Sequence, residues 1–178
     1  LTFIAISLLN HYISLYFSQD FELGYTTRYS FNIMNGFIEL SVNGYNYNYS
    51  KFLYKVLEYV KTIKPEEIII NMIIDKIIEN LKNTDTLTAL EYASYIMALQ
   101  QYKYMYSHID KLKYISILLN GNGGQDYVST ITTRLNNIAN MKNLSIMSIF
   151  YGNITMHDIP ILKSNKKREK IPLFLTLM

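Results

Sequence analysis

The hydrophobic pattern changes its period early in the chain. Residues 2–19 place apolar side chains at helical spacing, with Ser7, Asn10 and Ser14 on the other side, which predicts a buried helix. The chain opens at Leu1 within this pattern, so we expect the helix to be cut off at its N-terminus. Residues 25–33 and 37–42 instead alternate between two faces, as strands do. Asn35-Gly36 separates them and suits a two-residue turn, so the sequence predicts an antiparallel hairpin.

Helical spacing returns after the hairpin. Ser50 can cap a helix over residues 51–63, whose apolar stripe starts at Phe52. Pro65 is expected in the first turn of a helix over 68–81, with Glu66 and Glu67 at its positive end. Two further helices and their starts are therefore predicted from local chemistry alone.

The second half of the chain repeats these signals. Thr84 or Asp85 can cap a helix that runs to about residue 102, and Ser107 with Asp110 resembles a capping box for the next one. Asn120 to Gly124 breaks the pattern, and a helix over 125–140 follows. Residues 144–151 are β-prone and end at a glycine, and something short follows over 156–162. The order of elements predicts an α+β fold, with helices packed on a small mixed sheet that contains the antiparallel hairpin.

Length and charge give one domain and a distinct tail. The chain has 178 residues, which suits one domain over 1–162, and a basic, poorly ordered tail is expected over 163–178. Five Lys and Arg residues and one Glu give 163–170 a charge of +4, which leaves −1 for all other residues because the net charge is +3. The body is therefore too nearly neutral for a broad nucleic-acid surface. The tail itself could bind a polyanion or a membrane surface, or be an ordinary solvated run.

No residue set forms a complete catalytic, cofactor-binding or metal site. The chain has no cysteine. Glu66 and Glu67 are adjacent, so they do not face each other on a helix. Serines lack the G-x-S-x-G context of a nucleophile. We therefore assign no site residue to any of these three classes.

Three weaker candidates remain. Asn120 to Gly124 is glycine-rich but lacks the ending of a phosphate-binding loop, which favours a plain loop. The alternating Tyr102, Tyr104 and Tyr106 could stack on bases, but a turn lined by half-buried rings is favoured. Gly44-Tyr45-Asn46 follows a strand and could contact a partner.

The first 17 residues are largely apolar, yet they fit neither a signal peptide nor a membrane span. The first cation is Arg28, and Asn10 and His11 interrupt the apolar run. We expect no membrane span and a cytoplasmic location.

Three segments in the same order resemble the insulinase (pitrilysin) family of zinc metallopeptidases. The first runs from Glu22-Leu23-Gly24-Tyr25 to Ser41-Val42-Asn43-Gly44-Tyr45. The second runs from Glu91-Tyr92-Ala93-Ser94-Tyr95 to His108-Ile109-Asp110-Lys111-Leu112, and the third is Tyr151-Gly152-Asn153-Ile154-Thr155. Together they span residues 8–162, and the region they resemble is the family's middle, third domain.

The resemblance implies an architectural role. The family's zinc and its inverted H-x-x-E-H motif belong to the first domain, so no zinc-site or catalytic residue carries over to a position here, and the chain alone is expected to be inactive. It implies a non-catalytic domain that helps form the wall of a closed chamber for peptide substrates. Its partners would be the remaining domains of the parent peptidase, and peptide through the assembled chamber. The alternative is an unrelated soluble α+β interaction module with tyrosine-rich partner surfaces.

Overall fold

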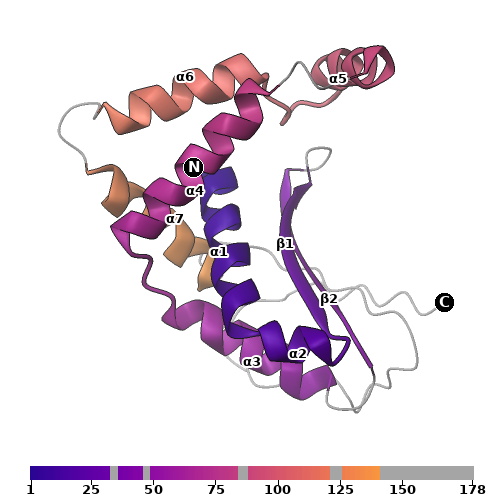
Figure 1. The fold of residues 1–178 in the computed structure, drawn as a ribbon, viewed down its shortest axis with the longest axis vertical. Helices are drawn as coiled ribbons and strands as arrows, with labels where there is room; N and C mark the ends of the chain where they lie inside the picture. Colours follow the sequence, from indigo (N-terminus) through magenta and orange to yellow (C-terminus); the bar gives the residue numbers. More distant parts are fainter. Residues whose placement is uncertain (33–35, 46–48, 84–87, 121–125, 141–178) are drawn as a thin grey trace, which may run out of the picture.

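The computed structural model describes residues 1–32, 36–45, 49–83, 88–120 and 126–140. Within these residues the chain is α+β, with seven helices and a two-stranded antiparallel hairpin (Figure 1). The elements are α1 (Thr2–Tyr16), α2 (Ser18–Glu22), β1 (Thr26–Asn32), β2 (Phe37–Asn43), α3 (Tyr49–Thr62), α4 (Glu67–Lys82), α5 (Ala89–Gln101), α6 (His108–Leu119) and α7 (Tyr127–Ala139). The predicted fold class is thus confirmed at this level, while the described part of the sheet contains the hairpin alone.

Helix α1 is the centre of the core. It packs against the hairpin on one side and against α4 and α7 on the other (Figure 1). Its side chains Ile4, Leu8, Leu9 and Ile13 are almost fully buried. Apolar residues occupy most of its circumference, which is typical of a helix with neighbours on several sides.

The single helix predicted over 2–19 is wrong at its end. Helix α1 stops at Tyr16, and α2 begins at Ser18. Phe17 between them is fully buried, with its ring 5.4 Å from that of Phe52 in an edge-to-face contact. We attribute the break to the burial of this large ring against a residue far away in the sequence. The local spacing of apolar residues does not predict such a contact. Phe3, which the pattern places on the inner side, is 50% exposed.

The hairpin has the predicted faces but not the predicted register: Asn32 pairs with Phe37, whereas a two-residue turn at Asn35-Gly36 would pair residue 34 with Phe37. Tyr29 pairs with Leu40 across the strands, and both lie on the inner face. Tyr29 is buried, and this burial raises the pKa of its phenol to about 12. Gly36 at the turn has a φ of +71°, the conformation that the Asn35-Gly36 signal predicts. Asn35 itself lies outside the described residues.

Asn10 joins α1 to the hairpin. Its Nδ2 donates to the Tyr29 carbonyl at 2.8 Å, and its Oδ1 accepts from the Tyr29 N–H at 2.7 Å. The sequence pattern assigns Asn10 to the polar side of the helix. The structure instead uses that side chain to satisfy both backbone groups of one strand residue, on the edge of β1 that β2 does not cover.

Several predicted helix starts are displaced by a few residues. Ser50 lies inside α3, which begins one residue earlier. Pro65 precedes α4, and Glu66 occupies the N-cap position without a side-chain cap bond. The buried stripe of α3, at Phe52, Val56 and Val60, is as predicted. The apolar stripe therefore predicted where α3 and α4 lie in the sequence. It did not predict the residues at which they begin.

The local capping signals predicted the start of α6 correctly but not the start of α5. Thr88, not Thr84 or Asp85, caps α5 and forms a capping box with Glu91. Ser107 caps α6 as predicted, because its Oγ accepts from the Asp110 N–H at 3.0 Å. Residues 84–87 lie outside the described part of the chain.

Other predictions also fall outside the described residues. These are most of the Asn120–Gly124 break, the strand over 144–151, the short element over 156–162 and the basic tail over 163–178. Among the helices that are described, none has the length and apolar character needed to span a bilayer.

Candidate functional site

The histidines are separated by the fold. His11 lies on α1 and His108 begins α6, while His157 falls outside the described residues. Across the described part of the chain, no three His, Asp or Glu side chains gather as a metal-ion site would require. The residues that the structure brings together thus supply no donor set for zinc.

His108 has a structural role at the joint between α5 and α6. Its backbone N–H donates to the Tyr95 hydroxyl at 2.8 Å, and the two rings lie 4.6 Å apart. Burial, and then the nearby Lys111 charge, lower the pKa of the His108 imidazole. This contact positions α5 against the start of α6.

Glu66 and Glu67 are used in packing between helices. The Glu66 N–H donates to the Tyr12 hydroxyl at 3.2 Å. The Tyr127 hydroxyl lies 3.1 Å from Glu67 Oε1 and 3.0 Å from Asn71 Oδ1, which links α7 to the first turn of α4. Glu66 is thus engaged through its backbone and Glu67 through its carboxylate, and in the described part of the chain no contact joins the two as an acid–base pair.

The surface depressions do not gather polar groups around a common point. The larger, of about 720 Å³, lies along α4 and is lined by residues of that helix alone: Ile68, Asn71, Met72, Asp75, Lys76 and Glu79. A second, of about 460 Å³, follows α7. Its Arg134 is already engaged, with Nη2 donating to Thr2 Oγ1 at 2.8 Å. Convergent polar groups from several elements, which ligand pockets usually have, are missing from both.

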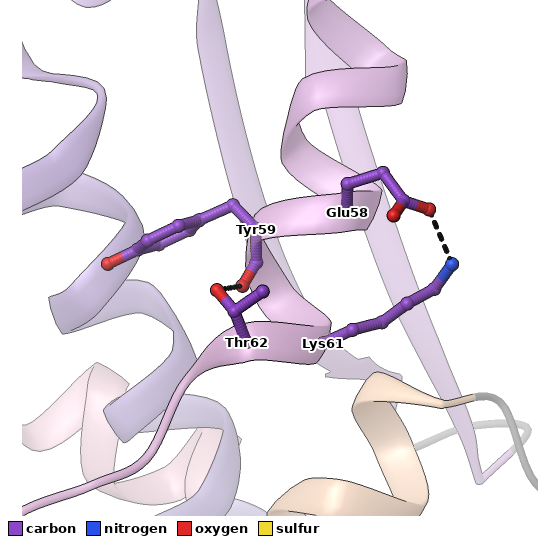
Figure 2. A network of polar contacts seen from close by, with 4 residues as sticks. All are labelled: Glu58, Tyr59, Lys61 and Thr62. Atoms are coloured by element: carbon purple, nitrogen blue, oxygen red, sulfur yellow. Dashed lines mark hydrogen bonds and ion pairs between the residues drawn. The ribbon is translucent and has the colours of Figure 1, made fainter.

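The polar contacts on α3 are ordinary helix chemistry. Lys61 Nζ lies 2.7 Å from Glu58 Oε1, and the Thr62 hydroxyl donates to the Tyr59 carbonyl at 2.7 Å (Figure 2). Both pairs are three residues apart in one helix, and both charged side chains are nearly half exposed. Such a pair contributes little to stability and indicates no site.

Two Gly-Tyr dipeptides close the open end of the hairpin. Gly24, with a φ of +87°, lies against the Tyr45 ring, and a Cβ there would approach that ring to 2.8 Å. Gly44 in turn lies against the Tyr25 ring, and the two tyrosine rings meet edge to face at 6.5 Å. We call this reciprocal contact the Gly-Tyr clasp. It gives Tyr45 an intramolecular role, although its side chain is also 68% exposed and thus still accessible to a partner.

Tyr104 closes the other end of the hairpin. A Cβ on Gly36 would lie 2.8 Å from its ring, so the turn and the α5–α6 loop are in close contact. Tyr102 is half-buried, as expected, whereas Tyr106 is 59% exposed. The predicted turn lined by half-buried rings is therefore only partly right.

The two faces of the hairpin differ sharply. The inner face carries Tyr29 and Leu40 against the core, while Arg28, Ser30, Glu39 and Ser41 alternate with them on the outer face. Arg28 and Glu39 are exposed, and neither has a charged partner within ion-pair distance in the described residues. The hairpin has helices on one side, and its other side carries these polar side chains together with Phe37, which is 58% exposed.

The exposure of helix α5, rather than the helix itself, is what the sequence analysis missed. None of its 13 residues is buried, although the helix is rich in Leu, Ile, Met and Tyr. The sequence does show that residues 89–101 contain a single formal charge, Glu91, but this alone is equally typical of a buried helix. An apolar helix with an uncovered surface is typical of an interaction site.

Searches against protein-family models, curated proteins and solved structures each returned no match.

Proposed function

We propose that the chain is a non-catalytic structural domain of an insulin-degrading-enzyme-like zinc metalloendopeptidase. In this role it helps form the wall of the chamber that encloses peptide substrates. Its partners are the remaining domains of that peptidase, and it meets peptide only through the assembled chamber. The proposal includes a third sheet strand over 144–151, which would make the sheet mixed, and a cytoplasmic location.

The main support for the proposal is where the first of the three segments that resemble the insulinase family lies in the fold. Its two ends, Leu23-Gly24-Tyr25 and Gly44-Tyr45, form the Gly-Tyr clasp. These dipeptides are 20 residues apart, and the glycine of each lies against the tyrosine ring of the other. The resemblance thus concerns residues that act together in the fold, which favours a shared domain over chance similarity.

The difference between the two faces of the hairpin also supports a role in the wall of the chamber. Helix α1 covers its apolar face, and the opposite face carries Arg28 and Glu39 toward solvent. A partition around an aqueous chamber needs one face that packs into the domain and one that water wets.

Zinc chemistry is assigned to another domain. The family's ligands belong to a motif that this sequence does not contain, and His11 and His108 lie on elements with different surroundings. Chelation should therefore leave the fold of the 178-residue chain unchanged.

The decisive experiment starts from the complete transcript that encodes this chain. Its product should contain an upstream H-x-x-E-H motif and should cleave a quenched fluorogenic peptide in a chelator-sensitive way. A complete product without that motif would overturn the proposal. The 178-residue chain alone, dialysed and then analysed for metal, should hold no stoichiometric zinc and should show no turnover in the same assay.

An unrelated soluble α+β interaction module is the second candidate. The uncovered apolar surface of α5 favours it, because a docking surface requires no catalytic partner. The same transcript separates the two candidates: a product that ends without any zinc motif, yet keeps this domain, supports the module.

A further inference from the structure

Two tyrosines from different helices stack face to face. The rings of Tyr16 on α1 and Tyr59 on α3 have centroids 4.0 Å apart and an interplanar angle of 18°. At that separation the carbon atoms of the two ring faces are in van der Waals contact. The two residues are far apart in the sequence and meet because α1 and α3 pack together. Tyr16 is 62% exposed, so small reagents in solution reach the pair.

The surrounding groups hold the two rings in this position. The buried Phe17 ring meets Tyr16 edge to face at 4.9 Å and Tyr59 at 5.6 Å, so it supports both rings from the core. The Tyr59 hydroxyl also donates to the Tyr12 carbonyl, at 3.4 Å. Figure 2 shows the Tyr59 ring on the side of α3 that faces away from the ion pair of that helix, so this pair leaves the stack uncovered.

The hydroxyl groups of the stacked rings lie near each other. Burial raises the pKa of the Tyr59 phenol, and negative charge on the Tyr16 phenol and then on the Tyr12 phenol would raise it further. Charges change a pKa in this way at short range. The ring carbons beside the two hydroxyl groups, the ortho carbons, are therefore close as well. A tyrosine that has lost an electron and its hydroxyl proton carries its unpaired electron on the oxygen and on these carbons.

The composition of the chain directs one-electron oxidation to tyrosine. The chain has 17 tyrosines and neither cysteine nor tryptophan, the two other side chains that give up an electron readily. Methionine is oxidised instead by the transfer of an oxygen atom, which gives a sulfoxide. A reagent that removes single electrons therefore leaves its radicals on tyrosine.

Two other tyrosine pairs meet in the described part of the chain, and their geometry is different. Tyr25 and Tyr45 meet edge to face at 6.5 Å, and Tyr92 and Tyr95 lie 6.4 Å apart at an angle of 43°. In neither pair do the two ring faces touch, so their ortho carbons are not stacked. Of these three pairs, the stacked one is therefore the pair arranged for a bond between its rings.

We propose that Tyr16 and Tyr59 form an oxidative cross-linking site, at which a peroxidase and hydrogen peroxide join α1 to α3 through a dityrosine bond. Each phenol gives up one electron and its hydroxyl proton, and the two radicals form a carbon–carbon bond between ortho carbons. The hydrogen on each of these carbons then moves to the oxygen of its own ring, which restores both phenols. Hydrogen peroxide takes up both electrons and both protons and becomes water. The proposal goes beyond the peptidase assignment and does not depend on it.

Treatment of the dilute 178-residue chain with a haem peroxidase and limiting hydrogen peroxide tests the site. The monomer, isolated by size-exclusion chromatography, should show the blue fluorescence of dityrosine and a mass lower by two hydrogen atoms. After proteolysis, mass spectrometry should find the Tyr16 peptide bonded to the Tyr59 peptide. Dityrosine found in cross-linked dimers alone, or in the monomer between other tyrosines, would overturn the proposal.

Conservative variants test the assignment of the pair. Tyr16→Phe and Tyr59→Phe keep the rings but remove the phenol that forms the radical, so each should abolish dityrosine in the monomer while its circular dichroism stays that of wild type. Tyr45→Phe is the matched control, because Tyr45 is 68% exposed and meets its tyrosine partner edge to face. It should leave the yield unchanged. A Tyr16→Phe yield equal to that of wild type, or to that of Tyr45→Phe, would contradict the assignment.

The cross-link should also stabilise the fold. A bond between α1 and α3 closes a long loop and restricts the unfolded chain, so the cross-linked monomer should melt several degrees above the untreated one. Peroxidase-treated Tyr16→Phe, which undergoes the same side reactions without the link, should show no such rise. An equal change in both treated samples would overturn the claim that the bond ties the two helices together.

Discussion

Replacing Asn10 by Ala tests how the hairpin is held to the core. The substitution removes two hydrogen bonds, of 2.7 and 2.8 Å, and leaves the N–H and C=O of Tyr29 without these partners. A typical intramolecular hydrogen bond contributes about 0.5–1.5 kcal/mol net, and a buried polar group left unsatisfied costs about 1–3 kcal/mol. Because Tyr29 is only 5% exposed, water reaches these groups poorly. We expect Asn10→Ala to lower the free energy of unfolding by about 2–4 kcal/mol.

Urea denaturation followed by far-UV circular dichroism measures this loss. With an m-value of about 2 kcal/mol/M, the middle of the usual range, the unfolding midpoint should fall by about 1–2 M. Asn136→Ala is the matched control, since Asn136 is exposed on α7, and it should stay within about 0.5 kcal/mol of wild type.

Asn10→Asp refines the test. It keeps an acceptor for the Tyr29 N–H but turns a negative charge toward the Tyr29 carbonyl, so it should be destabilised at neutral pH and partly recover in acid, where the protonated carboxyl can donate. An Asn10→Ala variant as stable as the Asn136→Ala control would refute the reasoning.

Three further outcomes follow from the fold. Leu9→Ala, at a fully buried position, should cost about 2–5 kcal/mol in urea unfolding, whereas Leu15→Ala, at a 63% exposed one, should cost far less; equal losses would contradict the core described here. Hydrogen bonds from Thr88 lower the pKa of the Glu91 carboxyl below its ordinary 4.5, so the cap stabilises α5 fully above that pH and is lost as the pH falls through the lowered value. The amide protection factors of α5, which correct for the intrinsic slowing of exchange in acid, should therefore fall in acid for wild type, and Thr88→Ala should remove that dependence; protection factors that do not change with pH would count against the capping box. Gly36→Ala places a methyl group against the Tyr104 ring at a φ of +71°, so its melting temperature should fall by several degrees, and no change would show that the contact is dispensable.

Local chemistry in the sequence was enough for much of the fold. Alternation gave the hairpin and its two faces, and the buried stripe of α3 followed from helical spacing at Phe52, Val56 and Val60. Ser107 could be predicted as a cap because the cap and its partner are three residues apart. These features depend on neighbours within one turn or one strand pair, which is the range that a sequence pattern describes.

The exposed apolar surface of α5 was harder to predict from the sequence. The apolar character of residues 89–101 is visible in the sequence, yet an apolar helix is normally buried, so exposure could not be read from composition. The absence of any motif for metal or nucleophilic chemistry was visible, because those sites need particular residue types at particular spacings.

Tertiary structure decided the rest through contacts between distant residues. The sequence by itself determined an α+β chain with a hairpin after its first helix. Only the folded chain could break that helix at Phe17, turn Asn10 from the polar side toward Tyr29, and bring Gly24 against Tyr45. In each case the contact joins residues at least 19 positions apart: the buried Phe17 ring meets Phe52, the Tyr29 backbone groups meet Asn10, and Gly24 meets the Tyr45 ring. The free energy of such contacts outweighed local preference.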